Sequence, residues 1–337
     1  MKTINIKLLT LVATFLVILL HTAAIPFSHF HVGWSVSVMY ETLGRIAFPL
    51  YLLIAGYVSL NKDESLLSTL KTRVLDLVIP LIAWSVIYLI YTNFVIDTRA
   101  PVSLLELLST PAYPHMWFIY TMILLYLMTP LLNTFITYGS RQRVLYTLTV
   151  WFVLASVYIL LDNTKANLLE NRAIPTPSNI DMVVYLSGFY IIGGVVRRFK
   201  ITPKVTISAI VFILSAVLTA VMTYSLSLAI TSPNEVFLFY SAPTLVVVSL
   251  GCFFMLLNAS FRYTKPVIKS LRILSRLSLG MFFVHAMVLE ALVKLLNISF
   301  VGYSSIVTIP LVALACFIIS AGIIWLLRLI PFVRRIT

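Results

Sequence analysis

Long, continuous apolar segments recur along the whole of this 337-residue chain. A helix that crosses a bilayer needs about 20 predominantly apolar residues, whereas the strands of a membrane barrel alternate apolar and polar residues over about ten. The segments lie at approximately residues 6–24, 36–60, 75–96, 115–138, 143–161, 181–197, 205–226, 236–258, 278–296 and 304–330. They predict an all-α, multi-pass membrane protein with about ten transmembrane helices.

The composition agrees with lipid as the main solvent. Hydrophobic residues make up 61% of the chain and charged residues only 10%, against about 25% charged residues in an average soluble domain. No polar stretch is long enough to bury a core of its own, so residues 1–337 are predicted to form one transmembrane domain. Cys252 and Cys316 lie in apolar segments without CxxC spacing and are predicted to fill the core.

The net charge of +13 would suit a nucleic-acid partner, but its placement indicates a membrane topology instead. Most of the 24 Lys and Arg fall on every second segment between the predicted helices. Membrane proteins carry an excess of Lys and Arg in their cytoplasmic loops, so these segments are predicted to be cytoplasmic. These are Lys2, Lys7, Lys62, Lys71, Arg73, Arg141, Arg143, Arg197, Arg198, Lys200, Lys204, Arg262, Lys265, Lys269, Arg272, Arg276, Arg328, Arg334 and Arg335. The others are Arg45, Arg99, Lys165, Arg172 and Lys294. Both termini are therefore predicted to be cytoplasmic, and no nucleic-acid partner is expected.

A cleaved signal peptide is an alternative for the first apolar segment. Lys2 and Lys7 precede a short apolar core, and the small residues of "TAA" would suit cleavage. The charge pattern does not separate the two possibilities, because the remaining nine spans keep their orientation in both. We favour a retained helix, since cleavage would also remove His21.

Five ionisable side chains are predicted to lie within the membrane, where such residues are rare and mark functional sites by default. His21 lies near the outer end of the first span, His115 opens the fourth span from the outer side, and His285 falls near the middle of the ninth. Arg45 lies within the second span. Glu290, in the upper half of the ninth, is a candidate partner for a histidine.

Each of these residues also has a structural alternative. His115 stands next to Trp117 and would suit an interfacial aromatic belt. Arg45 would pair with Glu41 one helical turn earlier, or extend toward the interface. His285 would join two helices through a hydrogen bond.

Metal binding is a further possibility for the histidines near the first span. Together with His21, His29 and His31 resemble a metal cluster only in residue type, and an outer loop explains these two residues better. No metal site is predicted.

Four segments carry a resemblance to a known family. They are "LLHTAA" in the first span, "GRIAFPLYLLIAGYV" in the second, "PHMWFIYTMILLYLMTPLL" in the fourth and "LSRLSLGMFFVHAMVLE" in the ninth. In this order and spacing the chain resembles acyltransferase family 3, whose ten-helix membrane enzymes O-acylate surface carbohydrates. Among these it looks most like the type that O-acetylates the enterobacterial common antigen.

The resemblance implies a site and a reaction. Its catalytic residues would be His21, Arg45, His115 and His285, with His21 as the base that activates an acceptor hydroxyl. The donor would be acetyl-CoA and the acceptor a surface or lipid-linked glycan, in the inner membrane of a bacterium and in contact with its lipids. A non-catalytic relative that acts in polysaccharide export is the alternative.

One departure from the family concerns the donor side. The first helix of the family carries an Arg eleven residues before its histidine and an acidic residue three positions earlier still, and here those positions are Thr10 and Lys7. Lys7 lies on the same helical face, nearer the cytoplasm, and would supply a point cation instead. Other candidates for holding the CoA phosphates are the basic residues Lys71, Arg73, Arg197 and Arg198.

Overall fold

The computed structural model describes residues 2–62, 65–96, 110–168, 177–300, 302 and 304–337. All regular elements of this part of the chain are helices, and ten stretches of it are long and apolar enough to cross a membrane. The prediction of an all-α multi-pass membrane protein is therefore confirmed. Two predicted outer cations, Arg99 and Arg172, lie outside the described residues.

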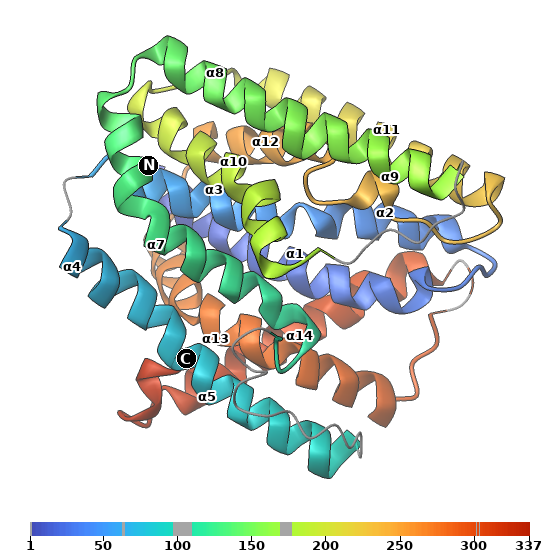
Figure 1. The fold of residues 1–337 in the computed structure, drawn as a ribbon. Coiled ribbons are helices and arrows are strands. Elements are labelled where there is room, and N and C mark those ends of the chain that lie inside the picture. The colour runs from blue at the N-terminus through green and yellow to red at the C-terminus, as the bar shows by residue number, and fades with distance from the viewer. Residues whose placement is uncertain (1, 63–64, 97–109, 169–176, 301, 303) are drawn as a thin grey trace.

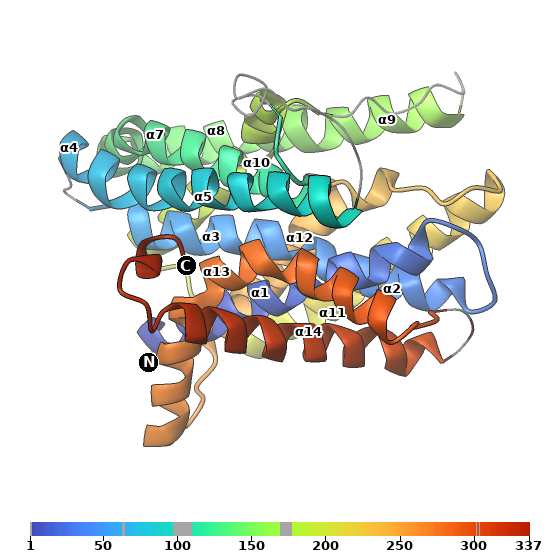
Figure 2. The ribbon, with the colours of Figure 1, turned by 90° about the horizontal axis from the view of Figure 1, so that it is seen from below.

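The helices run alongside one another in a layered bundle, and the N- and C-termini lie at the same end (Figures 1 and 2). They are α1 (Lys2–Phe27), α2 (Trp34–Arg45), α3 (Ala47–Ser59), α4 (Leu66–Thr69), α5 (Leu75–Tyr91), α7 (Trp117–Tyr138), α8 (Arg141–Phe152), α9 (Ile159–Leu168), α10 (Asn179–Arg198), α11 (Val205–Ala229), α12 (Pro243–Asn258), α13 (Lys265–Leu295) and α14 (Ser305–Leu327). Helix α1 contacts α2, α3, α12, α13 and α14. The first span is thus the centre around which others pack.

Short turns of tighter or wider helix complete the spans. Wide π-helical turns at Leu70–Val74 and Val153–Tyr158 join α4 to α5 and α8 to α9, and a third at Thr92–Ile96 follows α5. Tight 3₁₀ turns occur at Pro114–Met116, Val236–Leu238 and Val333–Arg335. The first of these carries His115 directly into α7.

The second span is divided in two by a proline. Proline lacks an N–H donor, and its ring clashes with the carbonyl four residues earlier. For Pro49 that carbonyl belongs to Arg45, where α2 ends. Helix α3 begins two residues later and regains its hydrogen-bond pattern with Leu50 N–H donating to the Ile46 carbonyl at 2.9 Å. The break leaves the Arg45 side chain at a helix end inside the bundle.

Glycines allow α3 and α10 to pack backbone to backbone. A Cβ atom added at Gly56 would lie 1.8 Å from the Tyr190 carbonyl oxygen, and one at Gly193 would lie 2.2 Å from the Leu53 carbonyl oxygen. Small residues of this kind drive close helix association in membranes. The glycines therefore fix the position of α3, which follows the break that carries Arg45.

We expect Gly56→Ala to destabilise the protein by about 1–3 kcal/mol, because the new methyl group has to displace the α10 backbone. Gly322 in α14 is the matched control, since nothing lies within 4 Å of a Cβ built there. Gly322→Ala should be neutral or slightly stabilising because alanine is the better helix former. Thermal unfolding of both variants in detergent measures the difference, and equal midpoints would contradict the close packing.

Candidate functional site

Three histidines from three different spans meet inside the bundle. His21 comes from α1, His115 from the turn before α7, and His285 from α13. The centroids of the rings lie 5.1 Å apart for His21 and His285, 4.8 Å for His115 and His285, and 6.1 Å for His21 and His115. We call these residues the histidine cluster.

The histidine cluster contains buried nitrogen atoms without hydrogen-bond partners. These atoms are Nε2 of His21, both ring nitrogens of His115 and Nε2 of His285. The side chains of His115 and His285 are 1% and 0% exposed, so an interfacial-belt position for His115 is wrong. Buried polar atoms are usually paired, and several unpaired nitrogens in one place indicate a site that receives a ligand.

The turn of α13 that carries His285 is held from two sides. His285 Nδ1–H donates to its own helix, to the Phe282 carbonyl at 2.6 Å. Tyr88 donates its hydroxyl to the Phe283 carbonyl at 2.6 Å, and Cys316 donates its thiol to the His285 carbonyl at 3.4 Å. Because the Phe282 carbonyl accepts the Nδ1 proton, Nε2 is the acceptor atom of the neutral ring. The structural alternative, in which the His285 ring hydrogen-bonds a neighbouring helix, is wrong, because the ring bonds within α13 and Nε2 has no partner.

A cavity of about 290 Å³ opens beside the histidine cluster, and we call it the histidine cavity. Its polar lining is His21, Tyr113, His115, Glu290 and Lys294. Its apolar lining is Ile25, Pro114, Ala286, Leu289 and Val293. Polar groups that converge against an apolar wall are typical of small-molecule sites.

Glu290 is bound to tyrosines of two other segments. Tyr91 donates its hydroxyl to Glu290 Oε2 at 2.7 Å, and Tyr113 donates to Oε1. Tyr113 in turn packs against His115, with ring centroids 5.6 Å apart. Glu290 therefore lines the histidine cavity, but its described hydrogen bonds go to tyrosines and not to a histidine. The sequence gives no signal for these tyrosines, because they are far from Glu290 along the chain.

Arg45 is held in a separate group of charges. Its Nε donates to Glu41 Oε2 at 3.0 Å and its Nη2 lies 2.7 Å from Glu235 Oε2. Its guanidinium also lies over the ring of Tyr240, 5.4 Å from the centroid. The structural alternative for Arg45, a pair with Glu41, is thus confirmed. The contact to Glu235 was not predicted. Helical spacing identifies partners only within one helix, and Glu235 lies in a loop far from Arg45 in the sequence.

A second cavity of about 330 Å³ lies at Arg45, and we call it the Arg45 cavity. Trp117, Glu235 and Tyr240 line it together with Asn163 and Asn179. Aromatic faces beside amides and charged groups can bind a polyol by stacking and hydrogen bonding.

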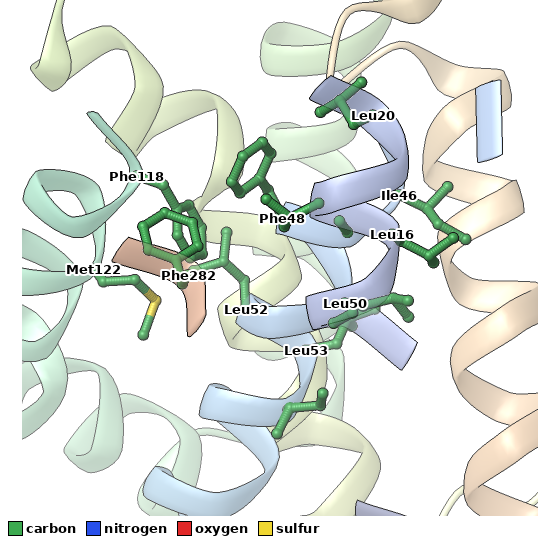
Figure 3. Packing of buried hydrophobic residues seen from close by; sticks show 14 of the residues in the cluster. Leu16, Leu20, Ile46, Phe48, Leu50, Leu52, Leu53, Phe118, Met122 and Phe282 are labelled. Atoms are coloured by element: carbon green, nitrogen blue, oxygen red, sulfur yellow. The ribbon is translucent and has the colours of Figure 1, made fainter. Parts of the chain in front are cut away.

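Aromatic side chains lie between the two cavities. Phe48 packs against Tyr240 of the Arg45 cavity at 5.2 Å and against Phe282 at 6.5 Å, while Phe282 packs against His115 at 5.3 Å. Phe118 completes this layer, 4.8 Å from Phe48 (Figure 3). The structure thus brings His21, His115 and His285 together, while Arg45 lines the other cavity and acts on His21 only through its charge.

The residues expected near the donor lie lower on α1. Thr10 donates its hydroxyl to the Ile6 carbonyl of its own helix at 2.9 Å, and Lys7 is half-buried. One turn above, Thr14 Oγ1 and the Tyr51 hydroxyl are 2.7 Å apart. The rise of an α-helix places His21 about 16 Å above Thr10. Thr10 is uncharged and its hydroxyl bonds to its own helix, so it does not replace the positive charge of an arginine at this position.

The other candidate donor residues are spread over the end of the bundle that holds the termini. Lys71 is exposed, and Arg73 donates to Ser59 and lies over the Tyr126 ring at 5.9 Å. Arg197 donates to the Tyr57 and Val58 carbonyls at 3.1 and 3.2 Å.

Arg198, the last of these candidates, donates to the Gly139 carbonyl at 2.8 Å. Like Arg197, it satisfies carbonyls at the end of a neighbouring helix. A guanidinium carries five N–H donors, so these contacts still leave donors for a phosphate.

Within the described ranges, no group of three His, Cys, Asp or Glu is arranged to hold a metal ion. His31 is bonded within the loop after α1, with Nδ1 2.8 Å from the Val32 carbonyl oxygen and Nε2 3.1 Å from that of Pro26. His29 Nδ1 lies 2.8 Å from the Ser28 hydroxyl. The loop alternative for both residues is therefore confirmed.

Comparison with known proteins gives one match. The model of a family described as an acyltransferase domain, of the third acyltransferase type, matches residues 4–328. No curated protein and no solved structure matches the chain significantly. The matched residues include all of the histidine cluster and both cavities.

Proposed function

Because the chain belongs to acyltransferase family 3, a family of membrane acyltransferases, we propose that it moves an acyl group from acyl-CoA to a hydroxyl of a glycan. We further propose that the acyl group is acetyl, and that the acceptor is a surface or lipid-linked glycan of the enterobacterial common antigen type. The protein would act in a bacterial inner membrane. The observation that carries the proposal is the convergence of His21, His115 and His285 with unpaired nitrogens beside a cavity.

His21 is the proposed general base. Its Nε2 is unpaired, and its side chain lines the histidine cavity. In the reaction, Nε2 takes the proton of the acceptor hydroxyl as the oxygen bonds to the thioester carbonyl carbon. When the carbon–sulfur bond breaks, the imidazolium returns the proton to the CoA thiolate. A well-placed base of this kind typically contributes about 10²–10⁴-fold to the rate.

His115 is the proposed donor to the developing oxyanion. Both of its ring nitrogens are unpaired and it shares the histidine cavity with His21. A neutral imidazole always carries one N–H, and a preorganised donor in a site that excludes water stabilises developing charge strongly. Arg45 ranks below His115 for this role, because it lines the Arg45 cavity and not the histidine cavity.

The acceptor would enter through the histidine cavity. Glu290 and Lys294 provide groups that can bind sugar hydroxyls, and the apolar wall excludes bulk water from the reacting atoms. The donor would approach from the opposite, cytoplasmic side, where the basic residues lie. His285 would act as a positioning residue that packs against the His21 ring and keeps its orientation. The two ring centroids are 5.1 Å apart, and a hydrogen bond from Tyr88 holds the turn of α13 that carries His285.

Mass spectrometry of surface glycans from cells with and without the gene tests the proposed function. We expect an O-acetyl mass difference of one acyl group on a defined glycan, present only when the gene is present and removed by mild alkali. An unchanged glycan profile, with the protein expressed, would contradict the proposal. A glycan that stays unacylated but accumulates inside the cell without the gene would support the export alternative.

Lys7 provides a separate test of the donor side. We expect Lys7→Ala to lower kcat/KM for acetyl-CoA by about tenfold or more, because one charge-assisted hydrogen bond to a phosphate would be lost. Lys7→Arg should retain most of the activity, and Lys2→Ala is the control at the exposed start of α1. If Lys7→Ala and Lys2→Ala act alike, Lys7 does not replace the arginine that is missing at Thr10.

A further inference from the structure

Three arginines surround a cleft where α13 and α14 meet at the end of the bundle that holds the termini. Arg276 belongs to α13, while Arg328 and Arg334 follow α14. The cleft has a volume of about 310 Å³. We call it the basic cleft.

The charges of the basic cleft are not balanced by acidic side chains. None of the carboxylates that the structure describes lies within 4.0 Å of these three guanidiniums. Arg328 Nη1 donates to the Arg276 carbonyl at 2.5 Å and Arg334 Nε donates to the Arg328 carbonyl at 2.8 Å. Main-chain contacts therefore hold the arginines together in spite of their mutual repulsion. Burial, together with the charges of Arg276 and Arg334, lowers the pKa of Arg328.

A group of this kind attracts an anion. Guanidinium groups bind phosphate by paired, charge-assisted hydrogen bonds, and Arg is the preferred residue where such recognition matters. The arginine side chains of the basic cleft are exposed or half-buried, so a ligand can reach them without a rearrangement of the fold.

An apolar stripe on α14 leads directly into the basic cleft. Leu311, Leu314, Ile318 and Trp325 follow one another at spacings of three, four or seven residues, which places them on one face of α14, and Leu329 lies two residues beyond the end of this helix. They are 58%, 45%, 60%, 52% and 59% exposed. Trp325 and Leu329 also line the cleft. This stripe therefore faces lipid and ends among the arginines.

Gly322 makes a notch in the α14 stripe. It lies between Ile318 and Trp325 on the same face, and a Cβ built there meets no atom within 4 Å. A hydrocarbon chain that lies along the stripe could pass over this notch toward the cleft. Trp325 suits this position, because tryptophan is enriched where hydrocarbon meets head groups.

A basic stripe on α13 reaches the cleft from the other direction. Lys265, Lys269, Arg272 and Arg276 are exposed and recur every three or four residues. These turns of α13 extend beyond the bundle beside the N-terminus (Figure 2). Clusters of Lys and Arg at the cytoplasmic edge of a transmembrane helix are typical of contact with anionic lipids.

We propose that the basic cleft binds the phosphate of an anionic phospholipid head group, with an acyl chain of that lipid along the α14 stripe. This site is separate from the proposed acyl transfer and does not depend on it. The apolar stripe favours a lipid over CoA as the source of the phosphate, because the stripe is exposed on the outside of the bundle and offers nothing to a soluble cofactor.

Native mass spectrometry of the full chain tests the proposal, with dioleoylphosphatidylglycerol as the probe and dioleoylphosphatidylcholine as the neutral lipid control. We expect the triple variant Arg276→Gln, Arg328→Gln and Arg334→Gln to bind phosphatidylglycerol about tenfold more weakly. The matched triple variant Arg141→Gln, Arg143→Gln and Arg262→Gln loses the same charge elsewhere and should change affinity less than twofold.

Two single variants separate the head group from the chain. Arg276→Gln removes no side-chain hydrogen bond within the described residues, so its expected loss of about threefold would not reflect unfolding. Gly322→Leu should weaken phosphatidylglycerol binding by filling the notch.

Three results would overturn the proposal. The first is an equal loss of binding in the two triple variants. The second is equal affinity of the unaltered chain for the two lipids. The third is displacement of phosphatidylglycerol from the cleft by micromolar CoA with unchanged binding in Gly322→Leu, which would assign the arginines to the cofactor.

Discussion

His21→Ala is expected to lower the rate of acyl transfer by about 10²–10⁴-fold, the usual contribution of a positioned histidine base. The reason is structural as well as chemical. His21 lines the histidine cavity with an unpaired Nε2, and its ring lies 5.1 Å from that of His285, whose turn of α13 is held by Tyr88 and Cys316. The rate would be measured with labelled acetyl-CoA and an isolated glycan acceptor.

The matched control for His21→Ala is His31→Ala. His31 is a histidine of the same outer region, but its ring is bonded within the loop after α1. We expect the control to keep full activity and both variants to insert and elute as the unaltered protein does. A His21→Ala protein that transfers acyl groups at the unaltered rate would exclude His21 as the base.

Arg45→Gln is expected to destabilise the protein by about 3–5 kcal/mol, because removal of one partner from a buried ion pair leaves an uncompensated charge. Glu41 is 0% exposed, and its second oxygen already has no partner. Without the guanidinium, Glu41 is left buried without its cation, and keeping it ionised or protonating it both cost free energy of unfolding. Thermal and urea unfolding in detergent measure the loss.

A double-mutant cycle tests the cause of that loss. Glu41→Gln introduced into Arg45→Gln should recover about 1–3 kcal/mol, because the buried charge disappears with its partner. Arg143→Gln, an exposed arginine at the start of α8, is the control and should change stability by less than about 0.5 kcal/mol. If Arg45→Gln and Arg143→Gln have equal stability, the Arg45 group is not a structural ion pair.

Apolar length predicted the spans well because the requirement for about 20 apolar residues acts on each helix alone. The sixth predicted span, 181–197, corresponds to α10 at Asn179–Arg198. The ninth, 278–296, differs most from the structure, since α13 begins at Lys265. Its first turns carry the basic stripe and are too polar to register as a span. Helical continuity there depends on hydrogen bonding and not on hydrophobicity, so the pattern did not reveal it.

The sequence predicted the individual residues of the candidate site, but it did not predict which of them lie next to one another in the fold. Each of His21, His115 and His285 stands out because an ionisable residue in a span is costly. Their meeting depends on how α1, α7 and α13 pack, which no local pattern encodes. The same holds for Glu290, whose partners Tyr91 and Tyr113 lie far from it in the sequence.

Arg45 illustrates the opposite outcome. The residue was correctly singled out as a charge within a span, and one turn of helix correctly suggested Glu41 as its partner. Arg45 nevertheless lines a different cavity from the histidines, next to Glu235 and Tyr240, which are distant from it in the sequence. Tertiary packing alone therefore decides which polar residues share a cavity.

The most direct test of acyl transfer across the bundle uses the purified chain in sealed vesicles, with labelled acetyl-CoA on the side of the basic loops and the glycan acceptor on the other side. We predict that alkali-labile label appears on the glycan, and that it does not appear with His21→Ala. Label that remains on CoA in vesicles with correctly folded protein, or equal labelling with His21→Ala, would contradict the assignment of the histidine cluster as the site of transfer.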